Sequence, residues 1–255
     1  MKNSLKILLS VMTSSLLLGS CKKENTGNDQ EQIYTSTVAD LGPGKASSWL
    51  KVDKSGTPIE LSLEINRDAL YNLPNTNFSG VVPLPAKAKE VTAFDHIQID
   101  WASQGHGMPS PNGPVHMSAH YDVRFYMTTE AERATIPAST DPTAKFNVHP
   151  PADYMPSNYR AGASALPQIG LHWIDGQGFT GMTRAMVLGT YNGKFTFVSP
   201  IVTVEELRSG SRSSTSYAQP EKFPKPNTYY PTKYNIYADD AKQKHQISLS
   251  DFVLR

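Results

Sequence analysis

Hydrophobic and polar residues alternate along several short segments of this chain. From residue 59 to 65 every odd position is isoleucine or leucine, and the even positions are glutamate or serine. Residues 97–101 follow the same rule, and residues 115–127 carry it over the longest distance, again with apolar odd positions. Because successive side chains of a strand point to opposite faces, the pattern predicts strands with one buried face.

Turn residues between apolar runs predict how such strands are connected. Asn192-Gly193 separates residues 184–191 from residues 194–201, and this pair readily adopts the two positive φ angles of a type I′ turn. We therefore expect a hairpin there. Lys54-Ser55-Gly56 predicts a second hairpin, between residues 49–52 and the alternating segment that follows.

The remaining segments are rich in residues that favour loops. Residues 137–167 contain many prolines and small polar residues, which predicts a long ordered loop lying over the sheet. The serine-rich residues 209–216 and the Pro/Tyr/Lys-rich residues 217–233 predict an extended crossing of the surface. Strand character returns at residues 234–238 and 245–249, so the C-terminus is expected to rejoin the sheet.

Helix signals are few. Thr129 with Glu132, and Thr203 with Glu206, have the spacing of a capping box and predict two short helices. The expected fold class is therefore mainly β: an antiparallel β-sheet domain, sandwich or barrel-like, with a few short helices and long ordered loops. All-β domains of this length are commonly single, so residues 33–255 are expected to form one domain.

The N-terminus resembles an export signal. Basic residues precede an apolar run from Ile7 to Leu18, and Gly19-Ser20 directly precede Cys21, the only cysteine. This order predicts a lipoprotein signal peptide at residues 1–20, acylation of Cys21 with palmitate-like chains, and a flexible polar tether at residues 21–32. The alternative is an ordinary secretory signal with a chance cysteine. The expected location is the cell envelope, in the outer membrane of a Gram-negative bacterium.

Composition narrows the possible partners. The chain has 24 basic and 23 acidic residues, so its net charge of +1 gives no reason to expect nucleic-acid binding. No second apolar stretch is long enough to span a bilayer, so the expected membrane partner is reached through the lipid alone. An acylated Cys21 would also exclude disulfides and cysteine catalysis.

The histidines suggest a metal site. Strand parity places His120, Asp122 and Arg124 on one face with His116, and it exposes His172 on its own strand. The same argument puts His96, Gln98 and Asp100 together on one face of the strand near residues 97–101. If these strands are neighbours, His106 can reach in from the preceding loop. Imidazoles and carboxylates are ligands for a transition metal such as zinc.

A second interpretation of these residues is a solvated sheet face on which polar side chains have no special role. Under this interpretation Asp122 and Arg124 form an exposed ion pair worth about 0–1 kcal/mol. We expect His149 and His245 to lie on the surface.

Gly176 to Gly181 match the spacing of a dinucleotide-binding loop, but the residues that follow predict a strand where that loop requires a helix. A tight turn between strands is therefore expected instead. Serine-hydrolase and phosphate-loop motifs are absent from the sequence.

Several short motifs, taken in order, resemble an uncharacterised bacterial family of secreted proteins and lipoproteins. The resemblance covers roughly residues 90–208. It implies a mostly β exported domain that can form a homo-oligomer. It also implies that His106, His120, Asp122 and His172 share one site. This chain departs from the family pattern, which often has a second histidine at the position of Arg124 and a shorter loop after His106. The departure removes one ligand, or makes His116 its substitute. The motifs are Phe94-Asp95-His96-Ile97, Asp100-Trp101, Gly105-His106, His120-Tyr121-Asp122-Val123, Phe125-Tyr126-Met127, Gly170-Leu171-His172-Trp173 and Gly189 to Lys194.

The sequence thus favours a lipid-anchored envelope protein that acts by binding or assembly at the membrane surface. The alternative is a metal-dependent enzyme or metal-binding protein, in which the His/Asp cluster holds an ion that activates water or oxygen. A third hypothesis is carbohydrate or peptide binding by the exposed aromatic residues of segment 217–237.

Overall fold

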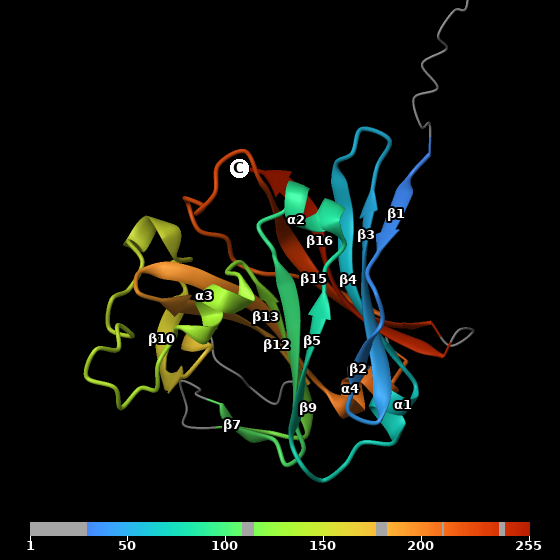
Figure 1. Cartoon of the computed structure of the whole chain (residues 1–255), viewed down its shortest axis with the longest axis horizontal. Helices are drawn as coiled ribbons and strands as arrows, with labels where there is room; N and C mark the ends of the chain where they lie inside the picture. The colour runs from blue at the N-terminus through green and yellow to red at the C-terminus, as the bar shows by residue number, and fades with distance from the viewer. Residues whose placement is uncertain (1–29, 109–114, 177–182, 211, 240–242) are drawn as a thin grey trace, which may run out of the picture.

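The computed structural model describes residues 30–108, 115–176, 183–210, 212–239 and 243–255. Within these ranges the chain is 51% strand and 11% helical, its sheets are antiparallel, and they do not close into a barrel (Figure 1). The mainly β fold class is therefore confirmed. The signal peptide, Cys21 and most of the tether lie outside the described residues, as does most of the glycine-rich segment that begins at Gly176.

The first sheet combines both ends of the described chain. Its strands run in the order β1-β3-β4-β16-β15-β14, and β2 pairs with β3 at the edge. All of the pairings are antiparallel, and the expected hairpin between residues 49–52 and 59–65 is the β3–β4 pair. The strands are β1 (Gln32–Thr35), β2 (Ala39–Leu41), β3 (Gly44–Val52), β4 (Pro58–Asn66), β14 (Ser213–Ser216), β15 (Tyr229–Asp239) and β16 (Lys244–Leu254).

The second sheet is built from the middle of the chain, in the order β10-β11-β12-β13-β9-β6-β5. The Asn192-Gly193 hairpin joins β12 to β13 as expected, and both turn residues have positive φ angles of 49° and 74°. A separate two-stranded ribbon, β7–β8, lies at one end of β9 (Figure 1). The strands are β5 (Phe78–Pro83), β6 (His96–Ala102), β7 (His106–Met108), β8 (Val115–Met117), β9 (His120–Tyr126), β10 (Tyr159–Leu166), β11 (Gly170–Asp175), β12 (Arg184–Tyr191) and β13 (Lys194–Thr203).

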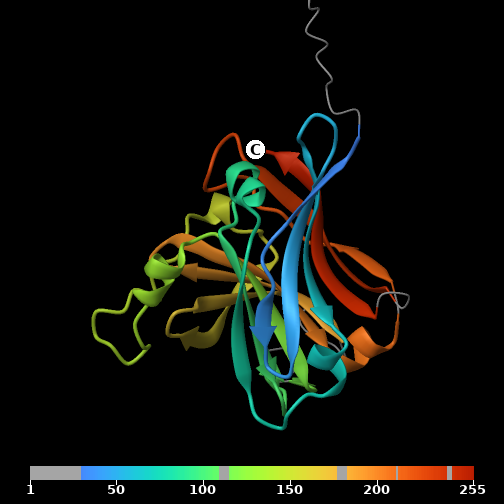
Figure 2. The ribbon, with the colours of Figure 1, turned by 45° about the vertical axis from the view of Figure 1, so that its right-hand side comes forward.

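The main apolar core lies between the two sheets (Figures 1 and 2). Leu61, Leu63 and Ile65 contribute to it from the first sheet, and Val123 and Phe125 contribute from the second. These are the odd positions of two segments in which apolar and polar residues alternate. Their complete burial confirms the parity predicted for β4 and β9.

Helices are short and few in the described part of the chain. Thr129 and Glu132 form the complete capping box of α3, whereas at α4 only Thr203 caps the backbone. The Glu206 carboxylate of α4 instead binds Thr183 and the Arg184 guanidinium. None of the described helices is long and apolar enough to cross a membrane. The helices are α1 (Asp68–Tyr71), α2 (Ala86–Val91), α3 (Glu130–Ala134), α4 (Val204–Arg208) and one 3₁₀ turn (Ala152–Tyr154).

Three segment boundaries differ from the sequence-based expectation. The expected loop at residues 137–167 ends early, because its last part forms the edge strand β10. The register of β10 against β11 shifts between Ala161 and Ala165, so apolar and polar residues do not alternate regularly along this strand. The serine-rich segment contains edge strand β14, held by backbone pairing to β15. The single strand expected at residues 115–127 is interrupted at residues 118–119, and its two parts join different sheets.

Candidate metal centre

Three side chains from two neighbouring segments converge at the end of β9. One ligand atom each from His106, His120 and Asp122 can be chosen so that all three lie within 4.8 Å of one another. The two imidazole Nε2 atoms are 3.1 Å apart, and His120 Nε2 is 4.0 Å from an Asp122 carboxylate oxygen. His120 and Asp122 share a face because they are two residues apart on one strand.

The ribbon β7–β8 brings His106 to this position. His106 pairs with Met117, and Gly105 makes the turn that precedes it, with a φ angle of 62°. A Cβ atom on Gly105 would lie only 1.9 Å from the backbone oxygen of Met117. Only glycine therefore allows this close approach of the two chain segments.

Hydrogen bonding fixes the protonation of His120. Its Nδ1 donates to the Ser118 carbonyl at 2.7 Å, so the lone pair of the neutral ring lies on Nε2, which faces His106. His120 is fully buried, and burial lowers its pKa, although the nearby Asp122 opposes this effect. The neutral ring, which is the form that binds metal, is therefore favoured.

His106 is exposed, and its Nε2 faces that of His120. Its Nδ1 lies 3.4 Å from the Gly107 carbonyl, and the tautomer that donates there has its lone pair on Nε2, as a metal ligand requires. The 3.1 Å separation of the two Nε2 atoms is that of a hydrogen bond in which His106 Nε2–H donates to the lone pair of His120, and a metal cation can take the place of that shared proton. A tetrahedral zinc ion with Zn–N distances of about 2.0–2.1 Å would separate two nitrogen ligands by about 3.3 Å, close to the observed distance.

Asp122 also belongs to a buried charge network. Arg124 Nη2 lies 3.2 Å from the Asp122 carboxylate, and Arg124 Nη1 donates to Asp100 on the neighbouring strand β6. Burial alone would lower the pKa of Arg124, but the two carboxylates outweigh it and raise that pKa. Gln98 donates to the second oxygen of Asp100 at 2.8 Å.

The interpretation of this face as solvated is therefore wrong. Asp122 is 7% exposed and Arg124 is 4% exposed, so their ion pair is buried. Residues on this same side of β9, β10, β11, β12 and β13 line one cavity, which means that this face of the second sheet is concave. Strand parity correctly assigned these side chains to one face, but it carries no information about sheet curvature.

The cavity has a volume of about 280 Å³, and two of the three candidate ligands, His106 and Asp122, line it. Much of its wall is apolar, and the polar wall includes His172 and Arg124. His172 thus lies in the expected site, but it lies outside the group of ligand atoms, because β12 and β13 separate β11 from β9. Three strand spacings of about 4.8 Å separate it from that strand along the sheet. The apolar wall is formed by Leu166, Ile174, Val187 and Ile201.

The other histidines have different environments. His116 is exposed on β8 and pairs with Gly107, so strand alternation directs it away from the face that His106 shares with Met117. It is not part of the ligand group. His149 is exposed as expected. The surface position expected for His245 is wrong: it is 6% exposed, because it lies on the same face of the central strand β16 as the buried Ile247 and Leu249, with the ring of Tyr71 against it.

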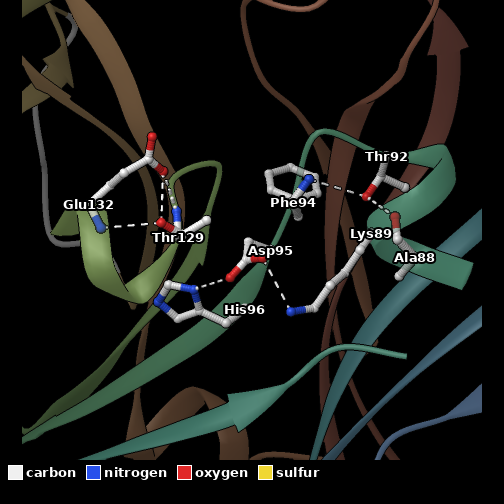
Figure 3. Close-up of polar contacts among 8 residues, drawn as sticks. All are labelled: Ala88, Lys89, Thr92, Phe94, Asp95, His96, Thr129 and Glu132. Carbon is white, nitrogen blue, oxygen red and sulfur yellow. Dashed lines mark hydrogen bonds and ion pairs between the residues drawn. The ribbon is translucent and has the colours of Figure 1, made fainter. Parts of the chain in front are cut away.

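His96 lies at the far end of β6 from the ligand group. Its ring stacks on Tyr126 at a centroid distance of 4.8 Å, and its Nδ1 is 3.0 Å from an Asp95 oxygen (Figure 3). Figure 3 also shows Asp95 reaching Lys89, while the Thr129–Glu132 capping box lies on the opposite side of His96. Burial lowers the pKa of His96 despite the hydrogen bond to Asp95. The contacts of His96 are structural.

Sequence reasoning found the three candidate ligands but missed the groups that orient them. The Ser118 carbonyl is a backbone atom, so no residue type signals its role. Gly105 carries a clearer signal, since a glycine directly before a candidate ligand often marks a tight turn. The apolar cavity wall comes from four strands and has no local signature.

Fold and site together define a β-sandwich protein with a candidate metal centre on the concave face of one sheet. Residues 53–101 are similar to a family described as TTHB210-like, hypothetical protein TTHB210. The matched segment runs from just before β4 into β6 and ends before His106. It overlaps the region of the expected resemblance only at residues 90–101, and it supports similarity to an uncharacterised family. Searches of curated proteins and of solved structures gave no significant match.

Proposed function

We propose that this protein binds one divalent transition-metal ion, of the zinc type, through His106, His120 and Asp122. The proposal is carried by the two imidazole Nε2 atoms, which face each other at 3.1 Å with a carboxylate beside them. The Ser118 carbonyl already holds the His120 ring in the tautomer that a metal requires. Neutral imidazole and carboxylate are suitable ligands for zinc.

Three protein ligands leave at least one coordination position for a water molecule or a small ligand. Structural zinc sites generally have four protein ligands, whereas sites at which the ion meets another molecule have three. The cavity beside His106 and Asp122 provides room for that molecule. A role in binding a small molecule through the metal is therefore favoured over a purely structural role.

Counting metal ions per chain tests this proposal. The full-length chain, purified in detergent and equilibrated with zinc, should hold one ion by elemental analysis. His106→Ala and His120→Ala should each lose it, whereas the matched control His116→Ala should keep it, because His116 is exposed and lies outside the group. A wild-type chain without zinc, or variants that keep it, would refute the proposal. Circular dichroism should show that each variant remains folded.

We also propose that the protein is anchored to the cell envelope by lipid on Cys21, in the outer membrane of a Gram-negative bacterium. The support is the sequence order alone: basic residues, an apolar run, and Gly19-Ser20 before Cys21. Cells grown with radiolabelled palmitate should label the wild-type chain and leave Cys21→Ser unlabelled. Equal labelling of both would exclude this anchor. Membrane fractionation of the same cells tests the assignment to the outer membrane.

A further inference from the structure

The cavity beside the candidate metal centre has two chemically different ends. His106, Asp122 and Arg124 provide a polar end, and Leu166, Ile174, Val187 and Ile201 provide an apolar wall. Ligand cavities in proteins commonly measure about 300–1,000 Å³. At about 280 Å³ this cavity lies near the lower end of that range and suits a small molecule, since an apolar cavity of about 150 Å³ can already hold benzene.

Charge at the polar end favours an anion once a divalent cation is bound. Asp100 and Asp122 contribute two negative charges, and Arg124 contributes one positive charge. With neutral His106 and His120, a metal ion of charge +2 brings the sum for the cluster to +1. Because a net charge is costly beside the buried Asp122 and Arg124, a monovalent anion stabilises the metal-bound state.

Arg124 has donor capacity for such an anion. A guanidinium carries five N–H donors, and the two carboxylate partners of Arg124 lie at Nη1 and Nη2, which have two hydrogens each. Arg124 also forms part of the cavity wall. The planar guanidinium matches carboxylate geometry better than a point charge does.

We propose that the cavity binds a small aliphatic monocarboxylate. Its carboxylate completes the coordination of the metal and accepts a hydrogen bond from Arg124, while its hydrocarbon tail lies against Leu166, Ile174, Val187 and Ile201. This inference rests on the proposed metal site and assigns the class of ligand to it.

The test uses the full-length chain in detergent, first loaded with zinc and checked for one ion per chain. Calorimetric titration with butyrate should show one site, with at least tenfold weaker binding of the neutral isostere butyramide. Acetate lacks two methylene groups and should bind about tenfold more weakly than butyrate. In a Co²⁺-loaded sample, butyrate should change the visible absorption spectrum, because the carboxylate enters the coordination sphere.

A cavity-blocking variant separates the site from surface binding. Leu166 is 41% exposed at the cavity rim, so Leu166→Trp should fold, keep its zinc and bind butyrate at least tenfold more weakly. The matched control is Val38→Trp, an exposed apolar position elsewhere on the chain, which should bind like wild type.

Two kinds of failure are distinguishable. If the wild-type chain takes up no zinc, the proposed metal site is wrong and this inference falls with it, before butyrate is added. If the chain holds one zinc ion but binds butyrate no better than butyramide, the carboxylate inference alone is overturned. Equal butyrate binding by Leu166→Trp, or by metal-free protein, also overturns it.

Discussion

The two faces of strand β9 are both buried, but for different reasons. Tyr121, Val123 and Phe125 face the first sheet and join the main apolar core. Asp122 and Arg124 alternate with them and face the concave side, where they are almost as inaccessible. One short strand therefore separates a packed core from a polar site. The buried residues of one face pack in the apolar core, and the equally buried residues of the other face form ion pairs beside the candidate metal site.

The difference lies in what each face requires of its neighbours. An apolar side chain needs only partners that fill the surrounding volume, so many combinations of residues satisfy it. A buried charge needs an oppositely charged group at the right distance, because its loss of solvation is large. Arg124 meets that requirement with two carboxylates from two strands. Loss of one residue should therefore have different consequences on the two faces.

The largest expected effect is on the core face. Phe125 is fully buried, so Phe125→Ala should lower the free energy of unfolding by about 3–5 kcal/mol. Urea denaturation with and without zinc should show the same loss in both conditions, because Phe125 points away from the metal group. The zinc content of the folded variant should stay at the wild-type value. A loss of zinc from folded Phe125→Ala would show that the two faces are coupled.

On the polar face, Arg124→Met leaves Asp122 and Asp100 without their cation. The cost should lie near the lower end of the range for a broken buried pair, about 3 kcal/mol, because the Asp100 side chain is 19% exposed. Zinc supplies positive charge beside Asp122, so adding it should restore part of the stability in urea denaturation. Zinc should not rescue Phe125→Ala in this way. Equal zinc effects on the two variants would contradict the contrast.

A smaller effect is expected where the ribbon carries His106 to the site. Gly105→Ala places a Cβ against the Met117 carbonyl and should cost about 1–2 kcal/mol from the left-handed backbone alone. Because His106 must shift, zinc affinity measured by competition with a chelator should also fall by about tenfold or more.

Gly56→Ala is the matched control for that variant. Its φ angle of 86° imposes similar strain, but a Cβ there meets no neighbouring atom. Its zinc affinity should equal that of wild type. The same affinity in Gly105→Ala would mean that the position of Gly105 does not determine that of His106.

The smallest effect is a pH dependence from His96. Burial lowers the pKa of His96 in the folded state, so the unfolded chain binds the proton more readily. In the metal-free protein, the contribution of neutral His96 to the free energy of unfolding should be fully present above about pH 6.5. Below that pH the free energy of unfolding should fall, by at most about 1.4 kcal/mol per pH unit for this one proton. His96→Gln should show a shallower decline in urea titrations between pH 7 and pH 5. His149→Gln, at an exposed position, should decline like wild type.

Local patterns predicted much of the fold. Alternation identified β4, β6 and β9 with the correct buried faces, and Asn192-Gly193 predicted the β12–β13 hairpin. Local patterns failed at β10 and β14, because an edge strand can be held by backbone pairing without a regular apolar face. At His245 the alternation itself was informative, because His245 shares a face of β16 with the buried Ile247 and Leu249, and the expected surface position did not follow it.

For the candidate site, the sequence alone determined which residue types occur and which of them share a face of a strand, because strand geometry alternates with a period of two. Only the tertiary structure decided that His106 reaches His120, that His116 does not, and that the polar face is a buried concavity. These outcomes depend on sheet curvature and on the fold of the β7–β8 ribbon. Both arise from contacts between residues far apart in the chain, so no local pattern encodes them.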